Sequence, residues 1–458
     1  MSPTGETRRT PNRTPRTRRR TTTAVAAAAA LALTAGACSS SGSEAGSAGD
    51  GTGKVTVWFH SGQGSERETL QRQVKEFNAS QKDVKVELTL LPEGSYNDQV
   101  QAASAAGDLP DLLDFDGPFL YNYVYKQKLT PLDDLVPDDV EKNLTEASKA
   151  QGTYDGKLYS LATFDSGMGI YGNKKMLDAA GVDYPEKPGG SWTADEFAAA
   201  VKKVAAETGR EKVLDLGLGN GKGEWFTYGY SPVIWSAGGD LIDRKDYASA
   251  DGTLNSPKVV DAFRTVQGWK KNIDPDTDAS GFVEGRTALS WNGHWQYPTF
   301  SEALGDDLVV LPLPDFGNGT KTGQGSWNWG ITSSSDNQKA AAKFLLYLMQ
   351  DEQVLAMSEA NGAPPATSSA MEKSKLYGPG KPLERFAAQL DASCGTGQPT
   401  PDCIAVPRPL TPAYPVITSA FQQAWEDIYD GGDPKAALDD AVEEIDQDIE
   451  DNHGYEQP

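Results

Sequence analysis

The sequence predicts an α/β fold with two lobes. Segments with strand-like and helix-like patterns alternate along the chain, and no internal repeat interrupts them. The chain has 458 residues, which is enough for two or three domains at roughly 150 residues each. About 420 residues remain when a predicted N-terminal leader is removed, and this length fits two α/β lobes with additional helices.

The first elements after the leader form a β-α-β unit. Residues 55–59 are β-branched and aromatic, which predicts a short strand. Residues 65–68 read Ser-Glu-Arg-Glu, a capping box that would open a helix, and apolar residues then recur at helical spacing. Residues 84–90 alternate between apolar and polar, as in a second strand. A unit of this kind builds a parallel sheet.

The same alternation continues to the C-terminus. Thr193 and Glu196 form a second capping box before a helix. Pro415 and Pro434 suit the first positions of the last two helices. Segment 221–235, which mixes aromatic residues with Gly and Pro, is expected to be a loop. The other predicted elements are strands at 112–115, 157–163, 169–171, 309–313 and 327–332 and helices at 97–106, 256–272 and 339–350.

The N-terminus has the features of an export signal. Residues 1–37 contain seven arginines and one acidic residue, and they end in an apolar stretch at 24–37 that is too short to span a membrane. Cys38 follows small residues, so we expect it to be lipidated as the first residue of the mature protein. Residues 38–53 would then form a flexible tether. An ordinary cleavage site before a chance cysteine is the alternative, and either general or twin-arginine export is compatible with the basic region.

The charge balance narrows the class of partner. The chain has 42 Lys and Arg against 65 Asp and Glu, a formal net charge of −23, although its leader is basic. A protein body this acidic disfavours nucleic acid, whose phosphates require a basic surface. The acidity suits a soluble protein that meets a neutral or cationic small molecule.

Two further cysteines predict a disulfide. Cys394 and Cys403 enclose a loop rich in Gly and Pro in a protein that is expected to be exported. Their spacing is not that of a redox motif. The bond would therefore hold the loop in place rather than take part in chemistry.

Aromatic residues give the clearest indication of a binding site. The chain has ten tryptophans, and several lie among Gly, Asn and His in segments 221–235, 290–295 and 326–330. Rings in such surroundings suit the apolar face of a sugar, whose hydroxyls need amide, carboxylate and guanidinium partners. By contrast, Trp269 and Trp425 lie on apolar helix faces and are predicted to be core residues. Trp192 precedes a helix N-cap, where it would pack as a hydrophobic staple.

No catalytic motif is evident. The three histidines, His60, His294 and His453, are far apart in sequence, and the chain has no G-x-S-x-G, P-loop or H-E-x-x-H pattern. We expect no metal and no cofactor. A pair of carboxylates for glycoside hydrolysis is not excluded, because such pairs come from distant strands.

Several short motifs resemble those of the extracellular solute-binding proteins of carbohydrate ABC transporters, the group that contains maltose-binding protein. The similarity runs from about residue 54 to the end, and Ser160, Ala162 and Gly172 depart from the family pattern. The matching segments, in family order, are LPDL (109–112) followed by Asp116, LTPLD (129–133), YDGKLYSL (154–161), 169–175, FVEGRTA (282–288), NGHW (292–295), WGI (329–331), 341–345 and RPLTPAY (408–414).

This resemblance implies a two-lobed fold of the periplasmic-binding-protein type. A hinge would close the lobes over a mono- or oligosaccharide in the cleft between them, without catalysis. By the family pattern, one lobe comprises 54–163 plus 314–352, and the other comprises 164–313 plus 353–458. The closed monomer would dock on the permease subunits of the transporter at the outer face of the cytoplasmic membrane.

The resemblance also implies candidate ligand-binding residues. Those after the first strand and at strand ends would hydrogen-bond hydroxyls, tryptophans would stack on the sugar, and an arginine would grip two oxygens with its fork. The candidates are His60, Ser61, Gln63, Asp116, Asp165, Trp235, Asn292, His294, Trp295, Trp327 and Arg408.

Other interpretations stay open at this point. His60 is also compatible with a packing role, Asp116 with a loop cap and Arg408 with a salt bridge. The protein as a whole is also compatible with a secreted carbohydrate-active hydrolase. A third interpretation is the same fold with a non-sugar ligand, such as a polyol, an amino acid or a peptide.

Overall fold

The computed structural model describes residues 48–186, 189–278 and 280–455. The predicted signal peptide, Cys38 and most of the tether lie outside the described residues. The predictions about export and lipidation therefore stay predictions.

The first sheet has four strands in the order β11-β3-β1-β2. β1 (Gly53–Phe59) pairs in parallel with β2 (Val84–Leu90) and with β3 (Leu112–Asp116), and β11 (Trp327–Ile331) is antiparallel to β3. Helix α1 (Gly64–Ser80) connects β1 to β2, which confirms the predicted β-α-β unit. The elements that complete this part of the chain are α2 (Tyr96–Ala106), α3 (Leu120–Tyr125), α4 (Asp138–Asn143), α5 (Glu146–Gly152), β4 (Thr153–Tyr154) and β5 (Lys157–Leu158).

The capping box of α1 differs from the predicted one. Gln63 is the N-cap, and its backbone N–H donates to Glu66 Oε2 at 3.3 Å. Ser65, the predicted cap, instead donates its hydroxyl to the carbonyl of Ala360 at 2.6 Å. The cap was misplaced because Gln63 has the extended backbone that a cap requires, which its residue type did not indicate. The true cap brings Gln63 and Glu66 to the end of β1.

The second sheet also has four strands, in the order β7-β8-β6-β9. They are β6 (Met168–Asn173), β7 (Leu214–Asp215), β8 (Leu289–Gly293) and β9 (Leu308–Leu311). The associated helices are α6 (Lys174–Ala179), α7 (Ala194–Thr208), α8 (Glu224–Ser236), α9 (Pro257–Gln267), α10 (Ser280–Val283) and α11 (Tyr297–Leu304). Trp192 packs on Phe197 across the predicted capping box of α7, with ring centres 5.6 Å apart, which confirms the hydrophobic staple.

Segment 221–235 is not the predicted loop. Residues 224–236 form α8, and every residue of this helix after Glu224 is buried. Trp235 has no exposed surface, and its Nε1–H donates to Asp240 Oδ1 at 2.8 Å. Its prediction as a stacking residue is therefore wrong. Burial on all sides of the helix outweighs the local preference of Gly229 and Pro232 for a loop.

The chain passes between the two sheets more than once. It leaves the first sheet after β3 and enters the second at β6, and it returns from β9 through β10 (Thr322–Gln324) to β11 of the first sheet. Strand β12 (Ala405–Pro407) pairs in parallel with β10 in this crossing region. The remaining helices are α12 (Gln338–Leu348), α13 (Asp351–Asn361), α14 (Ser368–Lys373), α15 (Glu384–Asp391), α16 (Tyr414–Asp430) and α17 (Pro434–Asp451).

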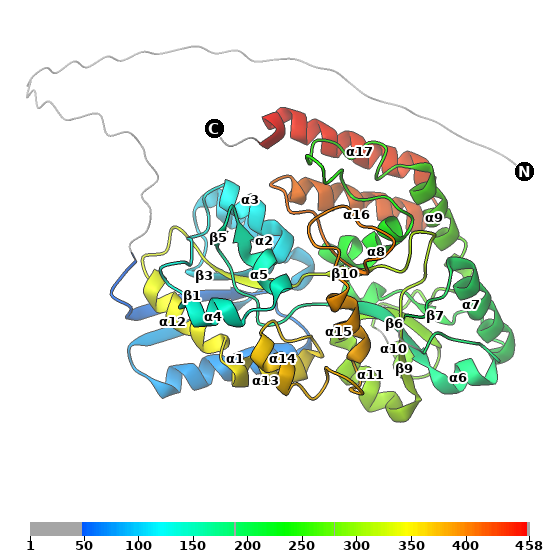
Figure 1. The fold of residues 1–458 in the computed structure, drawn as a ribbon, viewed down its shortest axis with the longest axis horizontal. Helices are drawn as coiled ribbons and strands as arrows, with labels where there is room; N and C mark the ends of the chain where they lie inside the picture. The colour runs from blue at the N-terminus through cyan, green and yellow to red at the C-terminus, as the bar shows by residue number, and fades with distance from the viewer. Residues whose placement is uncertain (1–47, 187–188, 279, 456–458) are drawn as a thin grey trace, which may run out of the picture. The chain divides into compact units, whose positions relative to one another are not determined.

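The two sheets have separate hydrophobic cores. Helices α1 and α12 cover β1, while α6 and α7 lie near β6 and β7 (Figure 1). Trp269 and Trp425 belong to the core around the second sheet, as predicted. Helix α13 packs on α1, where Gln73 Nε2 donates to the carbonyl of Gln353 at 2.9 Å. The proposed lobe boundaries themselves stay a prediction.

The predicted disulfide is present. Cys394 and Cys403 are bonded, with their Cα atoms 4.9 Å apart. The bond closes the loop between α15 and β12, and it holds the chain shortly before Arg408. The bond therefore restrains the loop that leads into β12, the strand that pairs with β10 in the crossing region.

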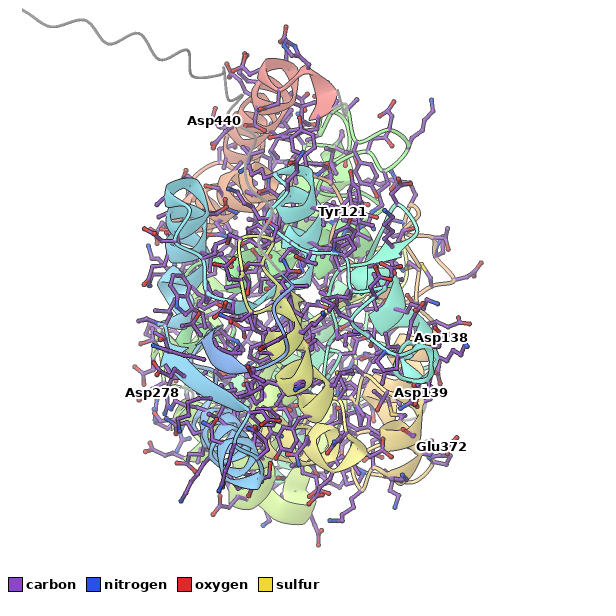
Figure 2. All side chains as sticks on the ribbon, turned by 90° about the vertical axis from the view of Figure 1, so that its left-hand side faces the viewer. Tyr121, Asp138, Asp139, Asp278, Glu372 and Asp440 are labelled. Atoms are coloured by element: carbon purple, nitrogen blue, oxygen red, sulfur yellow. A yellow bond between two sulfur atoms is a disulfide. The ribbon has the colours of Figure 1, made fainter. Side chains whose placement is uncertain are left out.

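The surface carries the acidic charge seen in the sequence. Asp138 and Asp139 on α4, Asp278, Glu372 and Asp440 are all exposed (Figure 2). Within the described part of the chain, no helix combines the length and apolar character needed to cross a bilayer.

Candidate functional site

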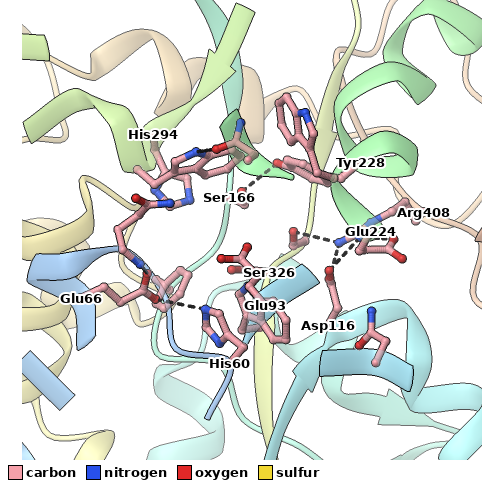
Figure 3. A pocket seen from close by; sticks show the side chains of 18 of the residues that line it. His60, Glu66, Glu93, Asp116, Ser166, Glu224, Tyr228, His294, Ser326 and Arg408 are labelled. Carbon is pink, nitrogen blue, oxygen red and sulfur yellow. Dashed lines mark hydrogen bonds and ion pairs between the residues drawn. The ribbon is translucent and has the colours of Figure 1, made fainter. Parts of the chain in front are cut away.

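A cleft lies where the carboxyl ends of β1 and β3 meet the first turn of α8 and the end of β8 (Figure 3). Ligand sites of α/β proteins commonly occupy such places, where strand ends and connecting loops converge. The lining residues are His60, Gln63, Glu66, Glu93, Asn97, Asp116, Phe164, Ser166, Asn220, Lys222, Glu224, Trp225, Tyr228, His294, Trp295, Gly325, Ser326, Trp327 and Arg408.

A buried ion-pair cluster around Arg408 forms one end of the cleft. Arg408 follows β12, and its Nη2 lies 2.5 Å from Asp116 Oδ1 while Nη1 lies 3.0 Å from Asp116 Oδ2. Nη1 is also 2.5 Å from Glu224 Oε1. The two-pronged contact with Asp116 is the strong, directional form of an Arg–carboxylate pair. The cluster therefore connects the end of β3, in the first sheet, to helix α8, which belongs to the core around the second sheet.

Glu224 is held from several sides. The hydroxyls of Tyr414 and Thr418 both donate to its carboxylate. The guanidinium of Arg408, its third partner, also lies over the Tyr228 ring, 4.8 Å from the ring centre. Burial raises the pKa of Glu224 to about 7, and the positive charge of Arg408 opposes that rise. Both oxygens of Glu224 are therefore engaged by the protein.

A second group surrounds His60 at the end of β1. The imidazole lies flat on the Trp327 ring, with centres 3.6 Å apart and planes 2° apart. Its Nδ1 is 2.5 Å from Asp114 Oδ2, and its Nε2 is 3.7 Å from Glu66 Oε1. Burial alone would lower the pKa of His60, but the negative charges of Asp114 and Glu66 outweigh it and raise that pKa to about 9. The ring is therefore an imidazolium at neutral pH.

The facing wall is aromatic. Trp225, in the first turn of α8, meets Trp295 at 88° with ring centres 5.6 Å apart. Trp295 donates its Nε1–H to Asn220 Oδ1 at 2.8 Å. Gly293 permits this packing, because a Cβ atom there would lie 2.1 Å from the Trp295 ring. The wall thus holds Trp295 partly exposed, and its ring lines the cleft.

His294 lies beside this wall but differs from His60 in charge. Its Nδ1 is 2.9 Å from the carbonyl oxygen of Asn361. Burial without an acidic partner lowers the pKa of His294 to about 4. At neutral pH the cleft therefore contains one charged and one neutral imidazole.

The structure brings together seven of the eleven predicted site residues. Asp116 and Arg408 are paired with each other, so the salt bridge that the sequence left open as an alternative role for Arg408 is present. The seven residues that line the cleft are His60, Gln63, Asp116, His294, Trp295, Trp327 and Arg408.

Four predicted residues do not line the cleft. Ser61 follows β1 with a left-handed backbone, and its hydroxyl accepts from Arg67 Nη1 at 3.3 Å. Asp165 is buried and accepts from the backbone N–H groups of Ser166 and Gly325. Asn292 lies one layer deeper, where its Oδ1 accepts from Asn220 Nδ2 at 3.0 Å. Trp235 is the core residue of α8 described above.

Sequence reasoning missed most of the acidic lining. Glu66 was assigned to the interior of a capping box, and Glu93 and Glu224 lie in no motif. Trp225 and Tyr228 belong to the aromatic segment that was noted, but helix periodicity was needed to separate them from Trp235. Hence residue type identified the aromatic character of the site, and only the fold identified its charge.

The two cleft histidines should titrate far apart. Because the pKa of His60 in the folded protein, about 9, exceeds the ordinary 6.5, its proton stabilises the fold below pH 6.5, and this contribution is lost as the pH rises through 9. For His294 the pKa is lowered, so stability is lost as the pH falls from 6.5 through 4. Imidazole ¹H–¹⁵N spectra, assigned with His60→Gln and His294→Gln, measure both values. Titration of either residue near 6.5 would contradict this description.

Comparisons with known proteins agree with this geometry. The family profile described as bacterial extracellular solute-binding protein matches residues 72–377. The maltotriose-binding protein of Pyrococcus abyssi is 24% identical over 321 residues, which cover 67% of this chain and 64% of that relative. A relative from Brucella abortus that is named only as a binding protein is also 24% identical, over 81% of this chain and 87% of its own length.

Solved structures show the same fold. The GacH receptor of Streptomyces glaucescens superimposes with a TM-score of 0.71 at 22% identity, covering 87% of this chain and 99% of the receptor. The cyclic α-maltosyl-1,6-maltose-binding protein of Arthrobacter globiformis gives a TM-score of 0.66 at 25% identity, covering 88% and 100%. The predicted two-lobed α/β fold and the family resemblance are therefore confirmed. This chain belongs to the bacterial extracellular solute-binding protein family.

Proposed function

We propose that this protein is the substrate-binding lipoprotein of an ABC importer, and that it captures a mono- or oligosaccharide outside the membrane and delivers it to the permease. The observation that carries the proposal is the facing arrangement of rings in the cleft. Trp295 presents one wall, and Trp327 lies opposite on His60. A pyranose offers apolar C–H faces to such rings and a rim of hydroxyls to the polar groups between them.

The polar lining suits hydroxyl groups. Gln63, Asn97, Ser166 and Ser326 all reach the cleft with uncharged donors and acceptors, and carboxylates lie beside them. Relatives support the same ligand class, since they are named as maltotriose-, maltodextrin- and multiple sugar-binding proteins. Structural neighbours include proteins bound to maltotetraose and to maltotriose.

Binding without catalysis fits the cleft better than hydrolysis does. A glycosidase needs one carboxyl group that is free to protonate the leaving group and a second that attacks or activates water. Two of the four lining carboxyl groups, Asp116 and Glu224, are held by Arg408 and are not free for these roles, and the relatives are named as binding proteins. Incubation with oligosaccharides should therefore release no new reducing ends, while calorimetry detects saturable binding. Release of product, lost in a single carboxylate variant, would instead establish a hydrolase.

The ion-pair cluster gives a physical basis for closure. Arg408 contacts a strand end of the first sheet and the first turn of a helix over the second. Hinge movement around the crossing strands would make or break contacts of this kind. In the proposed cycle the protein acts as a monomer, and its closed form docks on the permease subunits.

Stacking on Trp295 should provide a large part of the affinity. A Trp295→Ala variant is expected to lose roughly 2–4 kcal/mol of binding free energy, the scale of an interface hot spot, which corresponds to about 30- to 1,000-fold in affinity. Trp269→Ala is the matched control, because Trp269 is a core residue packed on Phe197 with ring centres 5.0 Å apart. Its loss should lower the free energy of unfolding by about 3–5 kcal/mol with little specific effect on binding.

Calorimetric titration beside thermal melts distinguishes the two variants. The sugar is first chosen from a panel by thermal shift, since a ligand at 100 times its Kd stabilises the fold by about 2.7 kcal/mol. If Trp295→Ala melts early yet binds the sugar normally, Trp295 is a structural residue and this wall is not the binding surface.

The membrane anchor can be tested separately. A Cys38→Ala variant should be exported and then released from the membrane fraction, because an acidic body has no other evident attraction to an anionic membrane. Durable anchoring by acylation requires two or more chains, at about 0.8 kcal/mol per buried CH₂. Fractionation followed by immunoblotting gives the result, and equal retention of the variant would refute lipidation at Cys38.

A further inference from the structure

The ionisable groups in the cleft do not balance. Four carboxylates line it, and a fifth, Asp114, lies directly behind His60. The cationic lining residues are His60, Lys222 and Arg408, while His294 is neutral. The four lining carboxylates are Glu66, Glu93, Asp116 and Glu224.

Two of the three cations are already committed. Arg408 pairs with Asp116 and Glu224, as described above. The Lys222 ammonium lies 2.6 Å from Glu426 Oε2, and the side chain is 72% exposed, so its charge is used outside the cleft. His60 is therefore the remaining cation for the acidic groups at its end of the cleft.

One imidazolium cannot neutralise all the acids around it. Asp114 Oδ2 lies 2.5 Å from Nδ1 of His60, and Glu66 Oε1 lies 3.7 Å from Nε2. Within the described residues, the Glu93 carboxylate has neither a hydrogen bond nor an ion pair. Glu93 is exposed, but the surrounding walls of the cleft raise its pKa to about 7. The negative charge of Glu66 adds to this rise, and the positive charge of His60 opposes it. Glu93 therefore holds a proton part of the time at neutral pH, and a bound cation would favour its ionised form.

The same end has buried acceptors without donors. Glu66 is only 5% exposed and lines the cleft, yet in the described structure its Oε1 accepts no hydrogen bond. The buried Oδ1 of Asn97, another lining residue, likewise accepts none among those residues. Buried acceptors that lack a donor are costly. Figure 3 shows Glu66, Glu93 and His60 around this part of the cavity.

An ammonium group has the chemistry that this arrangement lacks. It carries three N–H donors, no acceptor and a positive charge, so it can donate to acceptors such as Glu66 Oε1, the Glu93 carboxylate and Asn97 Oδ1, which all belong to residues that line the cleft. The adjacent Trp327 ring adds a face to which cations are attracted. A sugar hydroxyl offers one donor and no charge, so it would not stabilise the ionised form of these acids.

We propose that the solute of this cleft is an amino sugar, a mono- or oligosaccharide that carries a protonated primary amine, and that its ammonium lies at the Glu66–Glu93 end. This inference rests on the proposed function, because it assumes that the cleft binds carbohydrate. It adds the class of sugar: the rings hold the pyranose, and the acidic end selects the amine.

Matched sugars test the inference. Glucosamine, glucose and N-acetylglucosamine differ only in an ammonium, a hydroxyl or an acetamide at one carbon, and their linked dimers and trimers extend the series. Calorimetric titration near neutral pH should show the amine form binding roughly 10- to 100-fold tighter than either counterpart, the scale of a charge-assisted hydrogen bond. Raised salt should reduce that preference.

A matched pair of variants locates the amine. Glu93→Gln keeps the shape and removes the charge, so the preference for the amine form should fall at least about 10-fold. Glu68→Gln is the control, because Glu68 is exposed on α1 and does not line the cleft, and it should keep the preference. Thermal melts verify that both variants are folded.

The outcomes separate this inference from the proposed function. If glucose or its oligomers bind as tightly as the amine forms, the amino-sugar inference is overturned while sugar binding stands. A preference that persists in Glu93→Gln also overturns it. If spermidine or lysine binds and no sugar in the series does, the proposed carbohydrate function itself fails, and this inference fails with it.

Discussion

The buried contact between Arg408, Asp116 and Glu224 is the constraint on which the cleft depends. Removing three charges from water is unfavourable unless each is paired with good geometry. The guanidinium therefore fixes the positions of two carboxylates, one at the end of β3 and one at the start of α8. Glu224 is the first residue of α8, and Trp225 and Tyr228 follow within a turn. The position of the aromatic wall is therefore set by the same ion pair that joins the two sides.

The cleft has two electrically different ends. At the Arg408 end, the guanidinium and the hydroxyls of Tyr414 and Thr418 engage both oxygens of Glu224. Arg408 Nε is a buried donor there without a hydrogen-bond partner in the described structure. At the His60 end, one imidazolium faces several carboxylates, and buried acceptors lack donors in the described structure. Binding energy is most readily gained where the protein leaves groups unsatisfied. A solute with donors for the His60 end and apolar ring faces for the aromatic wall would complement this arrangement.

Much of the fold was predictable from local pattern. Strands β1, β2, β3 and β11 and the staple at Trp192 follow directly from alternation, β-branching and capping. Helix α8 was not predictable, because Gly229 and Pro232 favour a loop and only burial on every side makes the segment helical. The predicted strand at 157–163 was likewise too long, since β5 ends at Leu158 and the following residues cross towards the second sheet.

The site was predictable in kind but not in detail. Trp295 and Trp235 both stand among polar and glycine residues, yet one lines the cleft and the other fills the core. That difference depends on which face of α8 and which end of β8 meet, a tertiary fact with no local signal. Glu93 gave no motif at all, because its importance comes from neighbours far away in the sequence. Sequence patterns therefore indicated a sugar site, whereas its acidic end required the structure.

The histidines offer the most direct measurement of the central claim that a sugar binds in this cleft. His60 and His294 lie on its two sides, and His453 is exposed near the C-terminus as an internal reference. During titration with a sugar that binds, imidazole NMR signals of His60 and His294 should shift together with a single Kd, while that of His453 stays constant. Binding detected by calorimetry that moves neither cleft histidine, or only one of them, would contradict the account.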